Sequence, residues 1–145
     1  MKKGEDFTGI AVTYLCHDGQ GNFLFNKRGS KARDEQGTWD TGGGGLEFGD
    51  TIEETLRKEI SEEYCTDVLG YDFLGYRDVH REKDGRKTHW VALDFIVLIN
   101  REKVKNGEPE KLEEIAWFKL DQLPAPMNSQ FPVYWQQHKS KILRS

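Results

Sequence analysis

Hydrophobic residues in the first part of the chain form short runs separated by polar turns, a pattern typical of β-strands. The run Phe7–Cys16 is rich in β-branched and aromatic residues. A turn around Asp18-Gly19 separates it from a second run, Asn22–Arg28, so the two runs predict a hairpin. After a polar loop, the stretch GTWDTGGGG predicts a short strand that leads into four glycines.

The segment after the glycines changes to a helical period. It contains no Gly or Pro between Thr51 and Tyr64, and Leu56, Ile60 and Tyr64 recur every four residues. Thr51 followed by Glu54 forms a capping box, a common start of a helix. The pattern predicts an amphipathic helix over 51–64 with its apolar stripe packed on a sheet.

The second half of the chain repeats the order of strands followed by a helix. Strands are expected over 68–82 and 88–99, joined by a turn at KDGR, and a shorter one over Ile115–Leu120. A Pro-rich turn then leads to a helix from about Phe131 to Leu143. This order predicts an α/β or α+β fold in one domain, 1–145, with helices on the faces of a mixed sheet.

Composition narrows the classes of partner. The chain has 145 residues, of which 36% are hydrophobic and 32% charged, as expected for a folded domain with one core. A net charge of −4 argues against a protein that coats a nucleic-acid polymer. A small anionic ligand is still compatible with this charge, because a bound metal can reverse the local sign.

Two further observations bear on localisation. The longest apolar run, Trp90–Ile99, is interrupted by Asp94 and is too short to span a bilayer, and the first residues lack the apolar core of a signal peptide. Cys16 and Cys65 are not in a zinc-binding pattern and are interpreted as reduced thiols. We therefore expect a cytoplasmic protein with no membrane partner.

Carboxylates are concentrated on one face of the predicted helix. Glu59, Glu62 and Glu63 are spaced by three and four residues and are neighbours on a helix surface. Their mutual repulsion calls for a compensating cation, and Mg²⁺ prefers carboxylate oxygens. A solvated acidic face is the simpler interpretation. The glycines just upstream favour the metal, because glycine lets the backbone approach a phosphate closely.

These residues resemble the signature of a known family, the Nudix box, G-x5-E-x7-R-E-U-x-E-E-x-G-U, where U is a bulky aliphatic residue. The match runs over 44–66 with the spacing kept throughout. Five of the nine fixed positions carry the box residue: Gly44, Glu59, Ile60, Glu62 and Glu63. The other four are substituted: Asp50 stands at the first Glu, Lys58 at the Arg, Cys65 at the second Gly and Thr66 at the last aliphatic residue.

The resemblance implies a fold, a cofactor and a reaction. The fold would be the Nudix α/β/α sandwich, and the cofactor Mg²⁺ or Mn²⁺. The metal ligands would be Glu59, Glu62 and Glu63 with the carbonyl of Gly43. The enzyme would hydrolyse a phosphoanhydride of a nucleoside diphosphate linked to another group. Lys58 keeps the charge of the family's Arg but not its planar fork, and Cys65 replaces a helix-end glycine, so both changes put the rate in doubt.

Other candidate residues surround the box. MutT-like members of the family have a further carboxylate in the loop before the last strand, where Glu110 and Glu113 are the first candidates here and Glu108 stands behind them. A solvated loop is the alternative for all three. Asn128, in a segment LPAPMN that resembles a purine-contacting region, can pair with a base edge or simply form a turn. Substrate contacts are also expected from Arg28 to phosphate, from Gly44, and from Trp39, Phe25 or Tyr14 by stacking, with core packing the default for these aromatic residues.

The resemblance favours a small-molecule nucleotide as substrate, most of all a (d)NTP cleaved to the monophosphate and pyrophosphate. Oxidised or other non-standard nucleotides are included in this prediction. Nucleotide sugars, dinucleoside polyphosphates and coenzyme A stay open, the last because Arg28 and Arg33 have the spacing of a coenzyme A motif. The alternative to an enzyme is a domain that binds a nucleotide as a sensor without cleaving it. A homodimer is also possible, because proteins of this family often form dimers.

Overall fold

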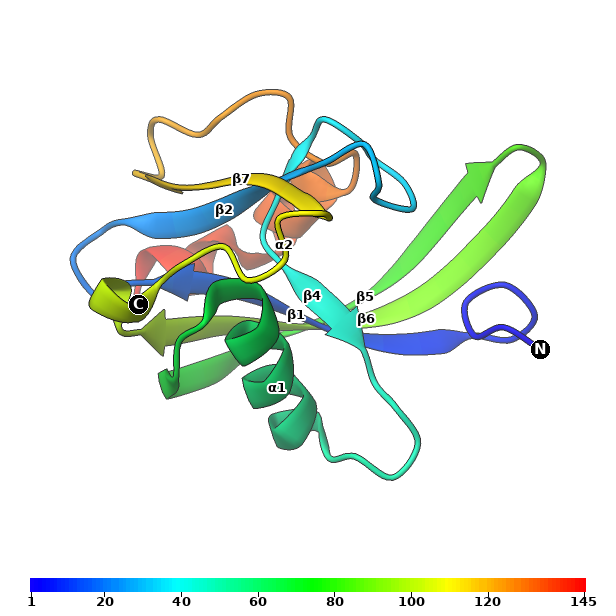
Figure 1. Ribbon diagram of the computed structural model, residues 1–145, viewed down its shortest axis with the longest axis horizontal. Helices are drawn as coiled ribbons and strands as arrows, with labels where there is room; N and C mark the ends of the chain where they lie inside the picture. The colour runs from blue at the N-terminus through cyan, green and yellow to red at the C-terminus, as the bar shows by residue number, and fades with distance from the viewer.

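A curled mixed sheet of seven strands forms the centre of the computed structural model, which describes residues 1–145 (Figure 1). Two α-helices and a short 3-10 helix complete the chain. In chain order the elements are β1 (Gly9–His17), β2 (Phe23–Arg28), β3 (Trp39–Asp40), β4 (Gly43–Gly45), α1 (Ile52–Tyr64), β5 (Val68–Lys83), β6 (Arg86–Ile99), η1 (Arg101–Lys103), β7 (Leu112–Phe118) and α2 (Phe131–Leu143).

The strand order is β3-β2-β1-β6-β5, with β4 paired to β1 and β7 paired to β2. Strand β1 runs parallel to β6 from Gly9↔Trp90 to His17↔Leu98, whereas the other pairings are antiparallel. The sheet is therefore mixed, as the sequence predicted. Because β1 pairs with three other strands, it places the glycine strand β4 beside the centre of the sheet.

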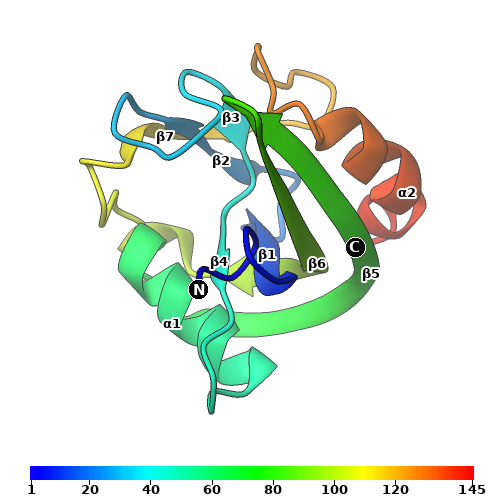
Figure 2. The same cartoon turned by 90° about the vertical axis from the view of Figure 1, so that its right-hand side faces the viewer.

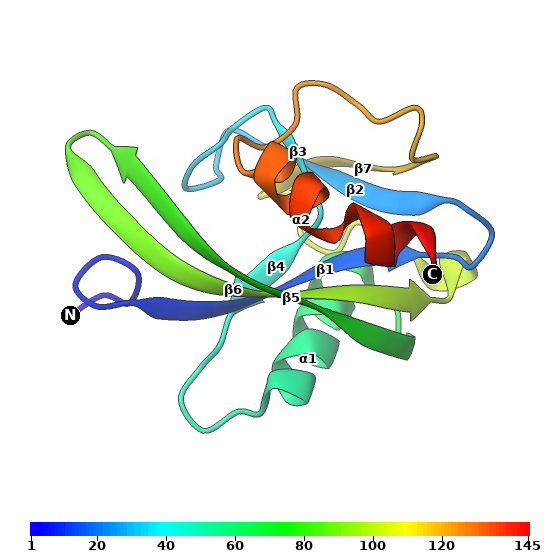
Figure 3. The ribbon, with the colours of Figure 1, turned by 180° about the vertical axis from the view of Figure 1, so that it is seen from behind.

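The helices cover opposite faces of the sheet, with α1 in front in Figure 1 and α2 in front in Figure 3, the view from behind. Helix α1 starts with the predicted capping box at Thr51 and Glu54. Its stripe of Leu56, Ile60 and Tyr64 is fully buried against the sheet in the first hydrophobic cluster. The α/β/α sandwich and the helix prediction are both confirmed.

Strands β5 and β6 form a long hairpin that extends beyond the rest of the sheet (Figure 1) and points toward the viewer in Figure 2. It turns at Asp84 and Gly85, which both have positive φ, at 52° and 77°. Two successive residues of this kind match the tight turn whose twist suits a hairpin. The predicted KDGR turn is confirmed. Residues of both hairpin strands line the pocket described below.

Two elements differ in extent from the sequence prediction. The short strand was expected to lead into the glycines, whereas Gly43–Gly45 themselves form strand β4, paired with Ala11, Val12 and Thr13 of β1. A Cβ at Gly43 would lie 2.7 Å from the Val12 carbonyl oxygen, so the pairing needs glycine. Strand β7 begins at Leu112 rather than Ile115, because its pairing with β2 continues past a bulge to Arg28. Neither α-helix has the length and apolar character that a membrane-spanning segment needs.

Candidate functional site

The three carboxylates of α1 lie at the edge of its buried face and differ in exposure. Glu63 is buried, with 9% of its surface exposed, Glu59 is half-buried and Glu62 is exposed. Glu59 lies directly on strand β4, since a Cβ at Gly44 would come within 2.3 Å of its carboxyl carbon. The absence of a side chain at Gly44 therefore makes room for the Glu59 carboxylate beside the glycine backbone.

Glu63 is the most strongly perturbed of the carboxylates. Its pKa is raised from 4.5 to about 8, mainly by burial and also by the nearby charges of Glu108 and Glu59, while a hydrogen bond donated by the Tyr14 hydroxyl to Oε1 opposes the shift. A buried carboxylate is stable only with a proton or a cation beside it. The site around Glu63 thus favours either protonation or a bound cation.

Glu59 shows the same tendency to a smaller degree. Its pKa is raised by burial and by Glu62, while the charge of Lys58 acts in the opposite direction. Lys58 itself is exposed, and none of the ion pairs of the chain involves it. At this position of the box, the residue therefore acts on the carboxylate only through its charge and does not hold it in place.

A loop between η1 and β7 closes over the C-terminal end of α1. The amides of Lys105 and Gly107 donate to the carbonyls of Tyr64 and Glu63, at 3.0 and 2.9 Å. These bonds satisfy carbonyls that a helix end otherwise leaves free. Gly107 is required for so close an approach, because a Cβ there would lie 2.1 Å from the Glu62 carbonyl oxygen.

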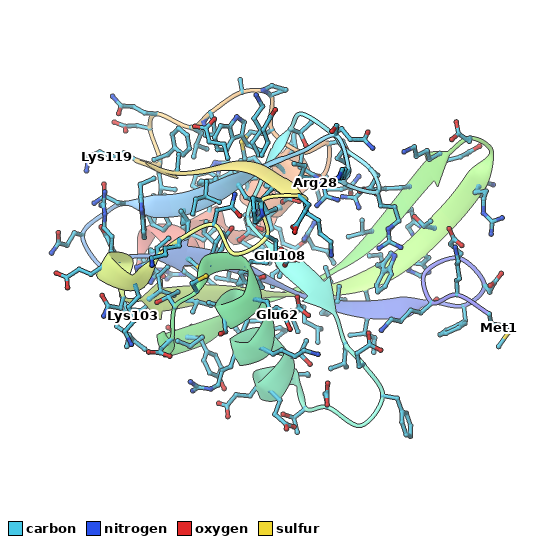
Figure 4. The ribbon with its side chains drawn as sticks, viewed as in Figure 1. Met1, Arg28, Glu62, Lys103, Glu108 and Lys119 are labelled. Carbon is cyan, nitrogen blue, oxygen red and sulfur yellow. The ribbon has the colours of Figure 1, made fainter.

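This loop brings Glu108, rather than Glu110, to the carboxylates of α1. The charge of Glu108 acts on both Glu59 and Glu63, and Figure 4 shows its side chain beyond the end of α1, between Glu62 and Arg28 in that view. Glu110 is exposed in the following turn, and Glu113 pairs with Lys27 at 3.4 Å. The sequence ranked Glu110 and Glu113 first, and the geometry reverses that order. The sequence feature that could have indicated Glu108 is Gly107 just before it, because a glycine lets the loop backbone approach the end of α1 closely.

A pocket of about 880 Å³ opens between the glycine strand and the β5–β6 hairpin. Gly43, Gly44 and Glu63 line one side of it, while Arg77 and Arg81 of β5 line another. Arg28 also lines the pocket, as predicted for a phosphate contact, and its guanidinium is held by Asp34 through bonds of 2.9 and 3.0 Å. One cavity therefore combines a glycine backbone, a buried carboxylate and several guanidinium groups.

Asn128 lines this pocket and is held by two neighbours. Its amide nitrogen donates to Asp40 Oδ2 at 3.2 Å, and its amide oxygen accepts from Arg81 at 3.3 Å. Burial raises the pKa of Asp40, which also lines the pocket. Asp40 was not among the sequence candidates. Its position in a short strand just before the glycines was the available signal.

The stacking role expected of Trp39 does not fit its position. Trp39 is only 7% exposed, packs edge-on against Phe118 with ring centroids 5.2 Å apart, and does not line the pocket. Phe25 and Tyr14 are fully buried. All three aromatic residues belong to the core, which is the default for aromatic residues in strands. The predicted role of Trp39 in stacking on the base is therefore wrong.

The donor set of α1 and the loop fits a hard divalent cation. The charge of Glu108 raises the pKa of both Glu59 and Glu63, Glu59 raises that of Glu63, and Glu62 raises that of Glu59. Carboxylate oxygens are the ligands that Mg²⁺ and Mn²⁺ prefer, and the cluster contains no imidazole or thiolate. A cation here would replace the proton that burial otherwise favours on Glu63.

Comparisons with known proteins agree with this geometry. The model of the NUDIX domain family matches residues 8–137, nearly the whole chain. The chain is 35% identical over 95 residues to proteins named nucleoside triphosphatase NudI from Escherichia coli O139:H28 and Shigella flexneri. These alignments cover 60% of this chain and 65% of the relatives, just under two thirds of their length.

Solved structures show the same fold. A MutT NUDIX hydrolase from Burkholderia pseudomallei superposes with a TM-score of 0.79 at 25% identity, covering 91% of this chain and 98% of the other. A MutT protein from Methanosarcina mazei Go1 gives 0.70 at 22% identity, covering 93% and 95%. Both likenesses extend over almost the full length of the two chains compared.

Proposed function

The chain belongs to the Nudix family, and from that premise we propose that it is a divalent-metal-dependent nucleoside triphosphate pyrophosphohydrolase. The reaction would convert an NTP or dNTP to the monophosphate and pyrophosphate. The observation that carries the proposal is the buried carboxyl of Glu63, which lies in the same pocket as the glycine strand and the arginines. It supplies negative charge for a cation next to the place where phosphates would bind.

We assign the cation to Glu59, Glu62 and Glu63, with the carbonyl of Gly43, and take Mg²⁺ as the physiological ion and Mn²⁺ as its substitute. When bound, the ion neutralises phosphate charge and stabilises the charge that develops on the leaving oxygen. Tyr14 donates its hydroxyl proton to Glu63 and so orients that carboxylate. Gly44 leaves space for Glu59 and for a phosphate close to the backbone.

Glu108 is the residue we propose as proton acceptor for the attacking water. It is the loop carboxylate whose charge acts on both Glu59 and Glu63, and its side chain is 23% exposed, so water can reach it. Its loop is fixed to the helix end by the Gly107 bond, which holds the carboxylate in place. Glu110 lies two residues further along, exposed, and offers a matched control.

The side chains that line the pocket suit both the phosphates and the base of a nucleotide. Arg28 is oriented by Asp34 and is assigned to a phosphate, since a guanidinium matches phosphate oxygens in geometry. Asn128 and Asp40 together offer a donor and acceptors to a base edge. The relatives at 35% identity are named nucleoside triphosphatases, which supports the choice of a triphosphate.

The test is product identification after incubation with Mg²⁺ or Mn²⁺. The panel holds normal and oxidised NTPs and dNTPs, ADP-ribose, coenzyme A, dinucleoside polyphosphates and nucleotide sugars. We expect monophosphate plus pyrophosphate from a triphosphate, and a rate at least tenfold lower in Glu108→Gln than in Glu110→Gln. Cleavage of coenzyme A alone would move the assignment to that class, for which Arg28 and Arg33 also line the pocket.

A nucleotide-binding sensor is the second candidate. It is favoured by Lys58, which does not form the ion pair that would orient Glu59, and by the strained backbone of Cys65 at φ 58°. Mg²⁺-dependent binding of a nucleotide with no product after long incubation would establish this candidate. Turnover of any nucleotide in the panel, lost in Glu62→Gln, would exclude it.

A further inference from the structure

A second group of metal-ligating side chains lies outside the carboxylate site. It consists of Asp78 and His80 on β5 and His89 on β6, whose ligand atoms all lie within 4.8 Å of one another. His80 and His89 are direct partners across the hairpin, and Asp78 is two residues from His80, so the three project from one face. We propose that these three residues bind a borderline divalent ion such as Zn²⁺, independently of the site on α1.

The three side chains already adopt a convergent arrangement. The imidazole rings of His80 and His89 stack with centroids 4.1 Å apart and planes 23° from parallel. Nε2 of His89 lies 2.9 Å from Oδ1 of Asp78. Two ring nitrogens and a carboxylate oxygen thus lie on neighbouring strands, and the sheet pairing fixes their spacing.

A hydroxyl group from another segment supports the arrangement. Oγ1 of Thr8 lies 3.2 Å from Nδ1 of His89, and the adjacent backbone is tied by a bond from His89 N to Gly4 O of 2.8 Å. An imidazole that ligates a metal through Nε2 commonly donates its Nδ1 proton to such a partner. With that tautomer, Nε2 and the Asp78 oxygen face each other as two acceptors, and a cation between them satisfies both.

The donor set selects the class of ion. Two imidazoles and one carboxylate form a ligand set that suits Zn²⁺, Co²⁺ or Ni²⁺, and the remaining coordination positions would be filled by water. Mg²⁺ takes oxygen ligands and binds imidazole poorly. The all-carboxylate cluster of α1 has the opposite preference, so excess Mg²⁺ separates the two sites in one experiment.

The cluster shares no residue with the proposed catalytic groups, and of its three members only His80 also lines the pocket. Arg77 and Arg81, which alternate with Asp78 and His80, turn to Asp94 and Asn128 on the pocket side. Asp78 and His89 are open to solvent, with side chains 59% and 37% exposed. An ion there would connect β5 to β6 in the part of the hairpin that extends past the sheet (Figure 1).

The experiment is equilibrium dialysis with Zn²⁺ in excess Mg²⁺, on chain without a histidine tag. Cys65→Ser serves as the background, because the exposed thiol of Cys65 can also bind Zn²⁺. We expect one Zn²⁺ per chain, at least tenfold weaker binding in both His80→Ala and His89→Ala, and unchanged binding in Glu62→Gln. Circular dichroism checks that each variant is folded, which the exposure of these side chains favours.

Thr8 gives a second, finer readout. Thr8→Val should weaken Zn²⁺ binding about tenfold, whereas Thr8→Ser, which keeps the hydroxyl, should bind as tightly as the background. Co²⁺ absorption bands would report loss of imidazole ligation in the same variants. Zn²⁺ binding that is unaffected by both histidine substitutions, or that is lost in Glu62→Gln, would overturn the proposal.

Discussion

Glu63 differs from Glu59 and Glu62 of the same helix in that its side chain is almost completely removed from water. Its pKa of about 8 lies above the value of 4.5 that it takes in water, chiefly because of burial. The folded chain therefore binds the Glu63 proton more tightly than the unfolded chain does. As the pH rises from about 4.5 to about 8, the unfolded state loses this proton first, and the free energy of unfolding falls.

We predict that Glu63→Gln stabilises the metal-free protein at pH 8 and has little effect near pH 4.5. The substitution removes the buried charge and keeps an oxygen to accept the Tyr14 hydrogen bond. In saturating Mg²⁺ the order should reverse, because only the wild-type carboxylate gains from the ion. Thermal unfolding at both pH values, with and without Mg²⁺, measures this; the same order in all four conditions would refute the assignment.

Cys65 shows how a change in the family signature acts on a single residue. It caps α1 in the left-handed conformation, with φ 58° and ψ 27°, at the position where the box has glycine. A residue with a Cβ is strained there by roughly 1–2 kcal/mol. Glycine is free of this strain but has more conformational entropy in the unfolded chain, which offsets part of the gain.

We therefore expect Cys65→Gly to raise the free energy of unfolding by about 1 kcal/mol. Cys65→Ala is the matched control, because it removes the thiol and keeps the Cβ. Urea unfolding of the three proteins distinguishes the two effects. Equal stabilisation by Ala and Gly would show that the thiol, and not the backbone conformation, is the cause.

At the scale of elements, the loop over the end of α1 connects helix geometry to the proposed chemistry. Gly107 allows this loop to bond to the helix carbonyls and so places Glu108 beside Glu63. A side chain at Gly107 would collide with backbone, which cannot move away as a flexible side chain could.

We predict that Gly107→Ala destabilises the protein by roughly 1–3 kcal/mol and lowers turnover by moving Glu108. Gly70→Ala, in β5, is the control, because a Cβ there meets no atom within 4 Å. Unfolding and turnover of both variants are measured together. Unchanged turnover in a destabilised Gly107→Ala would separate Glu108 from the reaction.

A buried polar network connects α2 to the sheet. Asp94 of β6, which is fully buried, contacts Arg77 at 2.6 Å and His138 of α2 at 2.7 Å, and Thr13 donates to it as well. Although burial alone would raise the pKa of Asp94, these hydrogen bonds hold it below its usual value.

Asp94→Asn should lower the free energy of unfolding by about 3–5 kcal/mol, since it leaves Arg77 without its countercharge. A loss under 1 kcal/mol in urea unfolding would show that the network carries little stability.

The elements were largely predictable from local patterns. The stripe of Leu56, Ile60 and Tyr64 predicted both α1 and its buried face, and the Asp84-Gly85 turn predicted the hairpin. Local patterns do not specify which strands pair at a distance. The parallel pairing of β1 with β6 and the order of the glycines as β4 depend on contacts across the sheet, and neither could be read from the local sequence.

The candidate site was predictable in part for the same reason. Glu59, Glu62 and Glu63 share one helix face through spacing alone. The choice of Glu108 over Glu110, and the place of Asp40 beside Asn128, depend on loops that meet only in the folded chain. Trp39 was misjudged because an aromatic residue in a strand does not reveal from its sequence whether it lines a pocket or fills the core.

At the scale of the whole molecule, the pocket is assembled from segments far apart in the sequence. The glycine strand and α1 supply its anionic side, while β2 and the β5–β6 hairpin supply guanidinium groups. A triphosphate needs both, because a cation and arginines share the neutralisation of its charge. With the proposed cation bound, this arrangement would let a chain of net charge −4 bind an anionic nucleotide.

The most direct test of this account is the turnover of the best triphosphate, with excess Mg²⁺, by wild type, Glu62→Gln and Glu53→Gln. Both glutamates lie on α1 and are exposed, but only Glu62 belongs to the carboxylate cluster. The account predicts monophosphate and pyrophosphate as products, a loss of at least a hundredfold in Glu62→Gln, about 2.7 kcal/mol in the barrier, and a near wild-type rate in Glu53→Gln. Equal rates in the two variants, or diphosphate and phosphate as products, would contradict it.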